Sequence, residues 1–158
     1  MRTMTRLSAA VVLVAGLCGQ HALAQSAKPK ALQLKDLPSS VQKTVQETLQ
    51  GGEVKNISKE KEDGIEQYEI ESTLKGKQRD FNVAADGRLL VVEEATTLDA
   101  IPAAAKATIQ KKVGGGTLTM VETFAKPGKP LLYEAGYKDA RGKRHEVLVD
   151  ANGTEVKD

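Results

Sequence analysis

The sequence has little of what most catalytic and nucleic-acid-binding sites require. Its 158 residues include 1 Cys, 2 His and no Trp, and aromatic residues make up 3%. A zinc site usually takes several His or Cys ligands, and a platform for stacked bases takes regularly spaced aromatic side chains. We therefore expect no metal centre, no cofactor and no nucleic-acid partner, and we expect a protein that is not an enzyme.

The first 24 residues are predicted to be a secretory signal peptide. Arg2 and Arg6 precede an apolar run at 7–19, which is too short for a membrane-spanning helix. Residues 22–24 read Ala-Leu-Ala, a small-x-small cleavage site. We expect cleavage after Ala24, a periplasmic or secreted mature protein, and no stable membrane insertion.

Removal of this segment changes the charge and the cysteine content. Loss of Arg2 and Arg6 lowers the Lys and Arg total from 23 to 21, which equals the 21 Asp and Glu. A neutral chain has no general attraction to nucleic acid or to an anionic membrane. Cys18 is lost as well, so the mature protein has no disulfide and its core must stabilise it.

One stretch of sequence occurs twice, at 76–87 and at 142–153. Each copy begins with Gly-Lys, alternates apolar and polar residues, and ends in Asp-Gly or Asn-Gly. This pattern indicates a β-hairpin, because Gly adopts the positive φ of the turn without a Cβ clash. Leu37-Pro38 and Ile101-Pro102 precede the two copies at nearly the same distance, which indicates an internal duplication.

The same pattern predicts the elements of each unit. Leu37, Val41, Val45 and Leu49 recur every fourth residue and predict one face of a helix. Four strands are expected after it, at 53–60, 65–74, 77–85 and 88–94, and their short turns imply antiparallel pairing. The predicted fold class is α+β, with two tandem repeats that each consist of one helix followed by a four-stranded antiparallel meander sheet. The expected divisions are a flexible lead at 25–35, the first repeat at 36–94, a linker at 95–100 and the second repeat at 101–158.

These residues resemble the PepSY and PepSY-like domain family, over positions 36–158. The resemblance implies an exported or envelope protein associated with peptidase inhibition or regulation. The two-unit arrangement is also similar to the architecture of beta-lactamase inhibitory protein, whose repeats carry disulfides that this chain lacks. The matching residues are Leu37-Pro38, Tyr68-x-Ile70, Gly76-Lys77 and 81–90 in the first copy, and Ile101-Pro102, Tyr133-x-Ala135, Gly142-Lys143 and 147–156 in the second.

Strand alternation gives the candidate binding residues. If Tyr68 and Ile70 face the helix, their neighbours point to the opposite side of the sheet. Ordinary solvation of a one-sided sheet is the alternative explanation for polar residues there. We expect a non-enzymatic binding module that acts as a peptidase inhibitor or regulates an envelope protein, and the alternative is a periplasmic small-ligand or cation-binding protein. The candidate binding residues are Glu69, Glu71, Asp80, Asn82, Glu134, Glu146 and Leu148.

Two further features are weighed against simpler explanations. His145, the only mature histidine, lies between Arg144 and Glu146, and a polar strand-end residue explains it better than a catalytic triad does. The segment 126–130 reads Lys-Pro-Gly-Lys-Pro and is expected to be a stiff, basic loop. A weak contact with an anion or a partner is the alternative there.

Overall fold

The computed structural model describes residues 32–62 and 64–157. The predicted signal peptide and its cleavage site lie outside the described residues, as does the lead before residue 32. In the remainder of that lead, a short 3₁₀ helix, η1, spans Leu34–Asp36. Leu32 and Leu34 pack against the first hydrophobic cluster.

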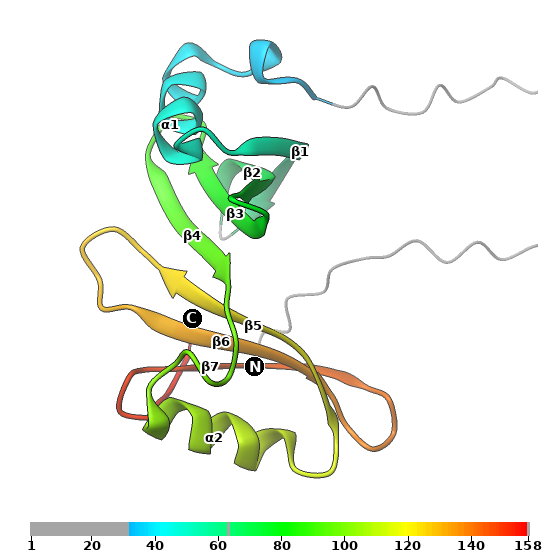
Figure 1. Cartoon of the computed structure of the whole chain (residues 1–158). Helices are drawn as coiled ribbons and strands as arrows, with labels where there is room; N and C mark the ends of the chain where they lie inside the picture. The colour runs from blue at the N-terminus through cyan, green and yellow to red at the C-terminus, as the bar shows by residue number, and fades with distance from the viewer. Residues whose placement is uncertain (1–31, 63, 158) are drawn as a thin grey trace, which may run out of the picture. The chain divides into compact units, whose positions relative to one another are not determined.

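The described chain contains two α-helices and eight strands after η1 (Figure 1). The helices are α1 (Ser39–Leu49) and α2 (Ala103–Val113), and each precedes a group of four strands in the chain. The strands are β1 (Glu53–Glu62), β2 (Ile65–Leu74), β3 (Lys77–Ala84), β4 (Leu89–Ala95), β5 (Thr117–Ala125), β6 (Leu132–Lys138), β7 (Arg144–Val149) and β8 (Glu155–Val156).

All eight strands form one antiparallel sheet in the order β1 to β8. The predicted fold class, two tandem repeats with one helix and a separate four-stranded meander sheet each, is therefore wrong. The sheet is continuous because β4 pairs with β5, from Val92 opposite Ala125 to Ala95 opposite Glu122. The backbone N–H of Thr96 extends this pairing by donating to Val121 O at 2.9 Å. The pairing includes residues 95 and 96, which belong to the predicted linker.

The first helix buries the stripe that its period predicts. Val41 and Val45 are fully buried among β-strand side chains that include Ile70 and Phe81. The helix ends where Gln50 and Gly51 take positive φ values of 49° and 85°, the left-handed conformation that commonly terminates helices. Burial of this stripe fixes α1 against β2 and β3.

The second helix packs in the same way with smaller side chains. Ala105 and Ile109 are fully buried against a second cluster that includes Val121, Ala135 and Val149. This cluster fixes α2 against β6 and β7. The described residues thus form two hydrophobic clusters on one sheet.

Each helix also contacts a tight turn. The hydroxyl of Thr44 in α1 donates to Gly87 O at 2.6 Å, and that of Thr108 in α2 donates to Gly153 O at 2.8 Å. Both glycines have positive φ, and a Cβ at Gly153 would lie 2.6 Å from Ala104 O. Each turn dipeptide therefore closes a hairpin, and its glycine also allows the helix to pack closely against the turn.

Candidate functional site: the acidic face of the sheet

The strand register assigns every side chain of the sheet to one of two faces. Tyr68 and Ile70 belong to the cluster under α1, so alternation places Glu69 and Glu71 on the opposite face. The β4–β5 pairing carries the same assignment into the second half, where Val121 lies in the cluster under α2. Both helices therefore cover the same face of the sheet.

The other face is rich in carboxylates, and we call it the acidic face. Among the described strand positions, its basic residues in the paired register are Lys138 and Arg144, opposite each other at the ends of β6 and β7. Lys55, at the bulge of β1, forms an ion pair with Glu53 at 2.5 Å. Carboxylates thus dominate its charge over most of the sheet. The acidic face is defined by Glu53, Glu60, Glu62, Glu69, Glu71, Asp80, Glu93, Glu122, Glu134 and Glu146.

All seven residues singled out from the sequence lie on this face, with different exposure. Glu71 and Glu146 are exposed, whereas Glu69, Asn82, Glu134 and Leu148 are half-buried. Asp80 is only 4% exposed. The exposed carboxylates are accessible to a partner, whereas Asp80 is almost entirely covered.

Neutral donors hold several of the carboxylates on β1 and β2. Ser58 Oγ donates to Glu69 at 3.1 Å, and Asn56 Nδ2 donates to Glu71 at 3.2 Å. Glu60 Oε1 accepts from Gln67 Nε2 at 3.0 Å and from Asn82 Nδ2 at 3.1 Å. Amide and hydroxyl donors orient a carboxylate without cancelling its charge, so this part of the face is both ordered and negative.

The carboxylate of Asp80 has a structural role. Its Oδ1 accepts from the backbone N–H of Ser72 at 3.0 Å, and its Oδ2 accepts from Gln78 Nε2 at 2.7 Å. The Ser72 hydroxyl donates to the backbone O of Arg79. These side chains satisfy backbone groups between the paired segments of β2 and β3, where a buried N–H without a partner would be costly.

Two pairs of carboxylates lie directly opposite each other across neighbouring strands. Asp80 is opposite Glu93 on β3 and β4, and Glu122 is opposite Glu134 on β5 and β6. Like charges in such positions destabilise a sheet unless neighbouring groups compensate them, and Glu93, Glu122 and Glu134 each have a further interaction. Asp80 and Glu122 are only 4% and 6% exposed, so one member of each pair is largely covered within the sheet.

Glu93 and Glu122 were not among the residues singled out from the sequence. Simple alternation from Val92 and Val121 would have placed both on the outward face. Their importance depends on the β4–β5 pairing, which brings the two acidic rows into one sheet. No sequence pattern indicated that pairing.

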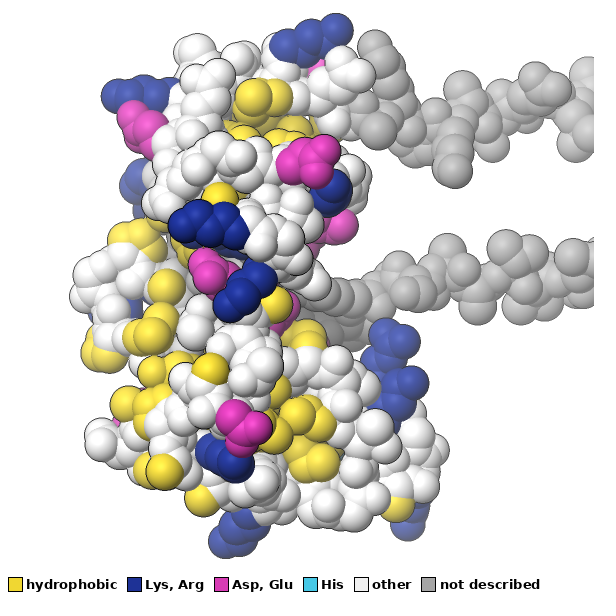
Figure 2. Space-filling model, in the orientation of Figure 1, with side chains coloured by type: hydrophobic (Ala, Val, Ile, Leu, Met, Phe, Trp, Pro, Cys, Tyr) yellow, Lys and Arg dark blue, Asp and Glu magenta, His cyan; other side chains and the backbone are white. Residues whose placement is uncertain are grey.

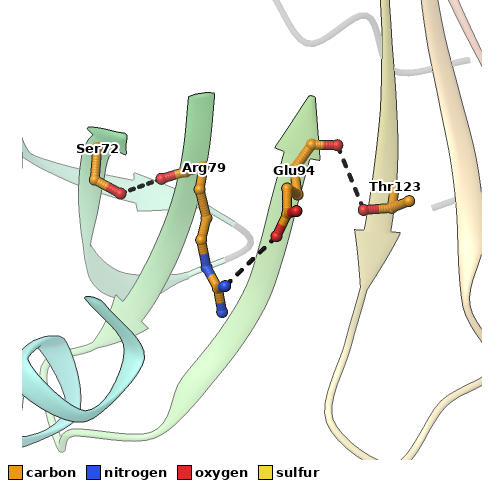
Figure 3. A network of polar contacts seen from close by, with 4 residues as sticks. All are labelled: Ser72, Arg79, Glu94 and Thr123. Carbon is orange, nitrogen blue, oxygen red and sulfur yellow. Dashed lines mark hydrogen bonds and ion pairs between the residues drawn. The ribbon is translucent and has the colours of Figure 1, made fainter. Parts of the chain in front are cut away.

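A second polar network lies on the helix-covered face, where the two halves of the sheet join (Figure 3). Arg79 Nη1 lies 3.4 Å from Glu94 Oε2, and Thr123 Oγ1 donates to Glu94 O at 3.4 Å. The Arg79 side chain is 14% exposed, and its Nε is buried without a hydrogen-bond partner among the described residues. Together with the Ser72–Arg79 bond, these contacts connect β2, β3, β4 and β5, so the network braces the junction.

His145 lies on the helix-covered face, away from the acidic face. Its Nε2 lies 3.0 Å from Asp139 Oδ2, and its ring stacks on Tyr137 with a centroid separation of 5.2 Å. The hydrogen bond from His145, followed by that from the backbone N–H of Lys143, lowers the pKa of Asp139 below its ordinary value of 3.8. This arrangement fastens the turn between β6 and β7.

The described residues form neither a metal-binding cluster nor a membrane-spanning helix. Within 32–62 and 64–157, no group of three or more His, Cys, Asp or Glu side chains is placed to hold a metal ion. Over the same part of the chain, no helix is both long enough and apolar enough to cross a membrane.

The fold is shared with solved structures. No family model and no curated protein matches the sequence, so the PepSY-like resemblance stays a prediction. The fold is BLIP-like: a BLIP-like protein from Bacteroides fragilis superimposes with a TM-score of 0.57 at 14% identity, over 77% of this chain and 84% of that one.

Two further structures agree with this assignment. A protein provisionally described as periplasmic, from Bacteroides eggerthii, has a TM-score of 0.63 at 15% identity, over 77% of this chain and 86% of its own. A DUF2874 family protein from Bacteroides ovatus has a TM-score of 0.61 at 12% identity, over 77% and 85%. At these identities the likeness concerns the fold alone.

Proposed function

We propose that this protein is an exported, non-enzymatic binding module whose acidic face receives a basic surface of a partner protein. The observation that carries the proposal is the row of carboxylates, with Glu71 and Glu146 exposed, on a face that neither described helix covers. Carboxylates outnumber basic side chains on this face, and Lys or Arg side chains of a partner would complement that charge.

Two lines of evidence support the proposed location of the protein and the proposed class of partner. The predicted signal peptide and the description of the Bacteroides eggerthii neighbour both favour the periplasm or the outside of the cell. The BLIP-like neighbour and the PepSY-like resemblance favour a peptidase or another envelope protein that is inhibited or regulated. The alternative, a small-ligand or cation binder, stays a prediction that a thermal-shift screen with metals and metabolites tests.

The test compares charge reversals on the two faces. Glu71→Lys and Glu146→Lys alter exposed positions of the acidic face, and Glu47→Lys on α1 is the matched control on the helix side. A photocrosslinker at residue 71 or 146 identifies a partner, whose affinity is then measured by calorimetry. We expect each acidic-face variant to weaken binding about three- to tenfold, with a strong salt dependence, and the control to leave it unchanged.

A panel of purified peptidases provides the second measurement. Inhibition that Glu71→Lys weakens and Glu47→Lys does not would support inhibition through the acidic face. The proposal fails if the face positions capture no more protein than residue 47 does, or if a captured partner binds all three variants equally.

A further inference from the structure

A second surface of opposite charge lies where β4 separates from β5. It is a groove of about 510 Å³, and Arg88, Leu89, Leu90, Lys126, Pro127 and Lys129 line it. Hydrophobic side chains gather around the loop between β5 and β6 in Figure 2. The groove therefore combines an apolar floor with three basic residues, of which Arg88 is paired with Asp86 at 2.8 Å.

The backbone of β4 is incompletely paired beside this groove. β3 pairs with β4 along most of its length, but β5 pairs only from Val92 to Ala95. Leu89–Val91 thus have no Cα partner in β5, because the chain turns into the loop after Ala125. An unpaired strand segment can accept the main chain of another extended segment.

The loop on the other side of the groove is preorganised. The N–H of Lys129 donates to Lys126 O at 3.1 Å and closes a turn at Pro127 and Gly128, which Pro130 follows. The ammonium of Lys126 lies 5.2 Å from the centroid of the Phe124 ring. Prolines and a closed turn limit the conformational entropy that such a loop loses on binding. The side chain of Lys129 is exposed at the rim.

We propose that this groove binds a short extended peptide segment that carries acidic side chains, and that it does so independently of the acidic face. The peptide backbone would add to the unpaired segment of β4, its apolar side chains would cover Leu89 and Leu90, and its carboxylates would meet Lys129 at the rim. A peptide fits better than an acyl chain with an anionic head, because only a peptide offers donors and acceptors to the β4 backbone.

The test uses the protein recovered after export and a fluorescent peptide that alternates valine and glutamate. Binding is followed by fluorescence anisotropy. Lys129→Glu should raise Kd about three- to tenfold. Lys111→Glu, the same charge change at an exposed site on α2, should leave Kd unchanged. A peptide with lysine in place of glutamate, and one N-methylated on alternate amides, should bind more weakly than the parent. Urea unfolding of both variants establishes that they are folded.

Several results would overturn this inference. If Lys129→Glu and Lys111→Glu change Kd equally, the loop does not contribute to binding. If the N-methylated peptide binds as tightly as the parent peptide, the peptide does not add to β4 as a strand. Binding of sodium decanoate without binding of the peptide would identify an amphipathic anion in place of a peptide. Amide NMR shifts confined to the acidic face, with none at Leu89, Leu90 or Lys129, would place the peptide elsewhere.

Discussion

The contact between α2 and the turn at Gly153 gives the sharpest test of how this fold is held together. Gly153 has φ of +81°, and a Cβ there would lie 2.6 Å from Ala104 O and 2.9 Å from Thr108 Oγ1. Gly142 has φ of +80°, but a Cβ there would meet nothing within 4 Å. Gly142→Ala therefore measures the conformational cost alone, whereas Gly153→Ala adds the collision with the helix.

The expected magnitudes follow from these two terms. A left-handed conformation costs a non-glycine residue about 1–2 kcal/mol, and both variants incur it. Displacing α2 from the turn also breaks the 2.8 Å bond from Thr108 to Gly153 O, a loss of about 1 kcal/mol or more. We expect Gly153→Ala to lower the free energy of unfolding by about 3 kcal/mol and Gly142→Ala by about 1–2 kcal/mol.

Urea unfolding followed by circular dichroism measures the difference, provided that the m-value is the same in both variants. The first half of the chain supplies a replicate. A Cβ at Gly87 would lie 2.8 Å from Ser40 Cβ, whereas one at Gly76 would meet nothing within 4 Å. If Gly153→Ala is no more destabilising than Gly142→Ala, and Gly87→Ala no more than Gly76→Ala, then close packing of the helices against these turns is refuted.

Three further predictions concern the core, the turn at Asp139 and the junction of the sheet. Ile109→Ala should lower the free energy of unfolding by about 2–5 kcal/mol and Ile109→Val by about 0.5–1.5 kcal/mol, because this side chain is fully buried; urea titration measures both. Since His145 lowers the pKa of Asp139, the stability from that carboxylate exists above its ordinary value of 3.8 and is lost as the pH falls through the folded-state pKa. Asp139→Asn should therefore lose less stability than the parent between neutral and strongly acidic pH, and equal pH profiles would contradict this. Glu94→Ala should destabilise the protein by about 1–3 kcal/mol, because it leaves the largely buried Arg79 without its anion, and adding Arg79→Met should recover part of the loss in thermal unfolding.

Sequence patterns located most of the secondary structure. The period of Leu37, Val41 and Val45 predicted the first helix, and the strand expected at 65–74 is β2 with the same bounds. The strand expected at 77–85 is one residue longer than β3, and the strand expected at 88–94 is shifted by one residue at each end from β4. These features could be predicted because period, turn chemistry and helix termination act over a few neighbouring residues.

The acidic face was predicted only in part. Alternation from Tyr68 placed Glu69 and Glu71 opposite the helix, and the register agrees. It could not indicate that Asp80 is buried, because that burial depends on hydrogen bonds to Ser72 and Gln78. The alternation of side chains along a strand predicts the face to which each side chain points. The exposure of that side chain depends on the residues that neighbouring strands place around it.

The sequence by itself determined the hairpin turns, the helices and the alternation that separates apolar from acidic side chains. Only the tertiary structure decided that the two groups of strands form one sheet, through the pairing of Val92–Ala95 with Glu122–Ala125. Strands pair through backbone groups, and every residue except proline carries both the N–H and the C=O group. The identity of the side chains therefore does not show which of two distant strands will pair. That pairing also joined the carboxylates of both halves into one surface.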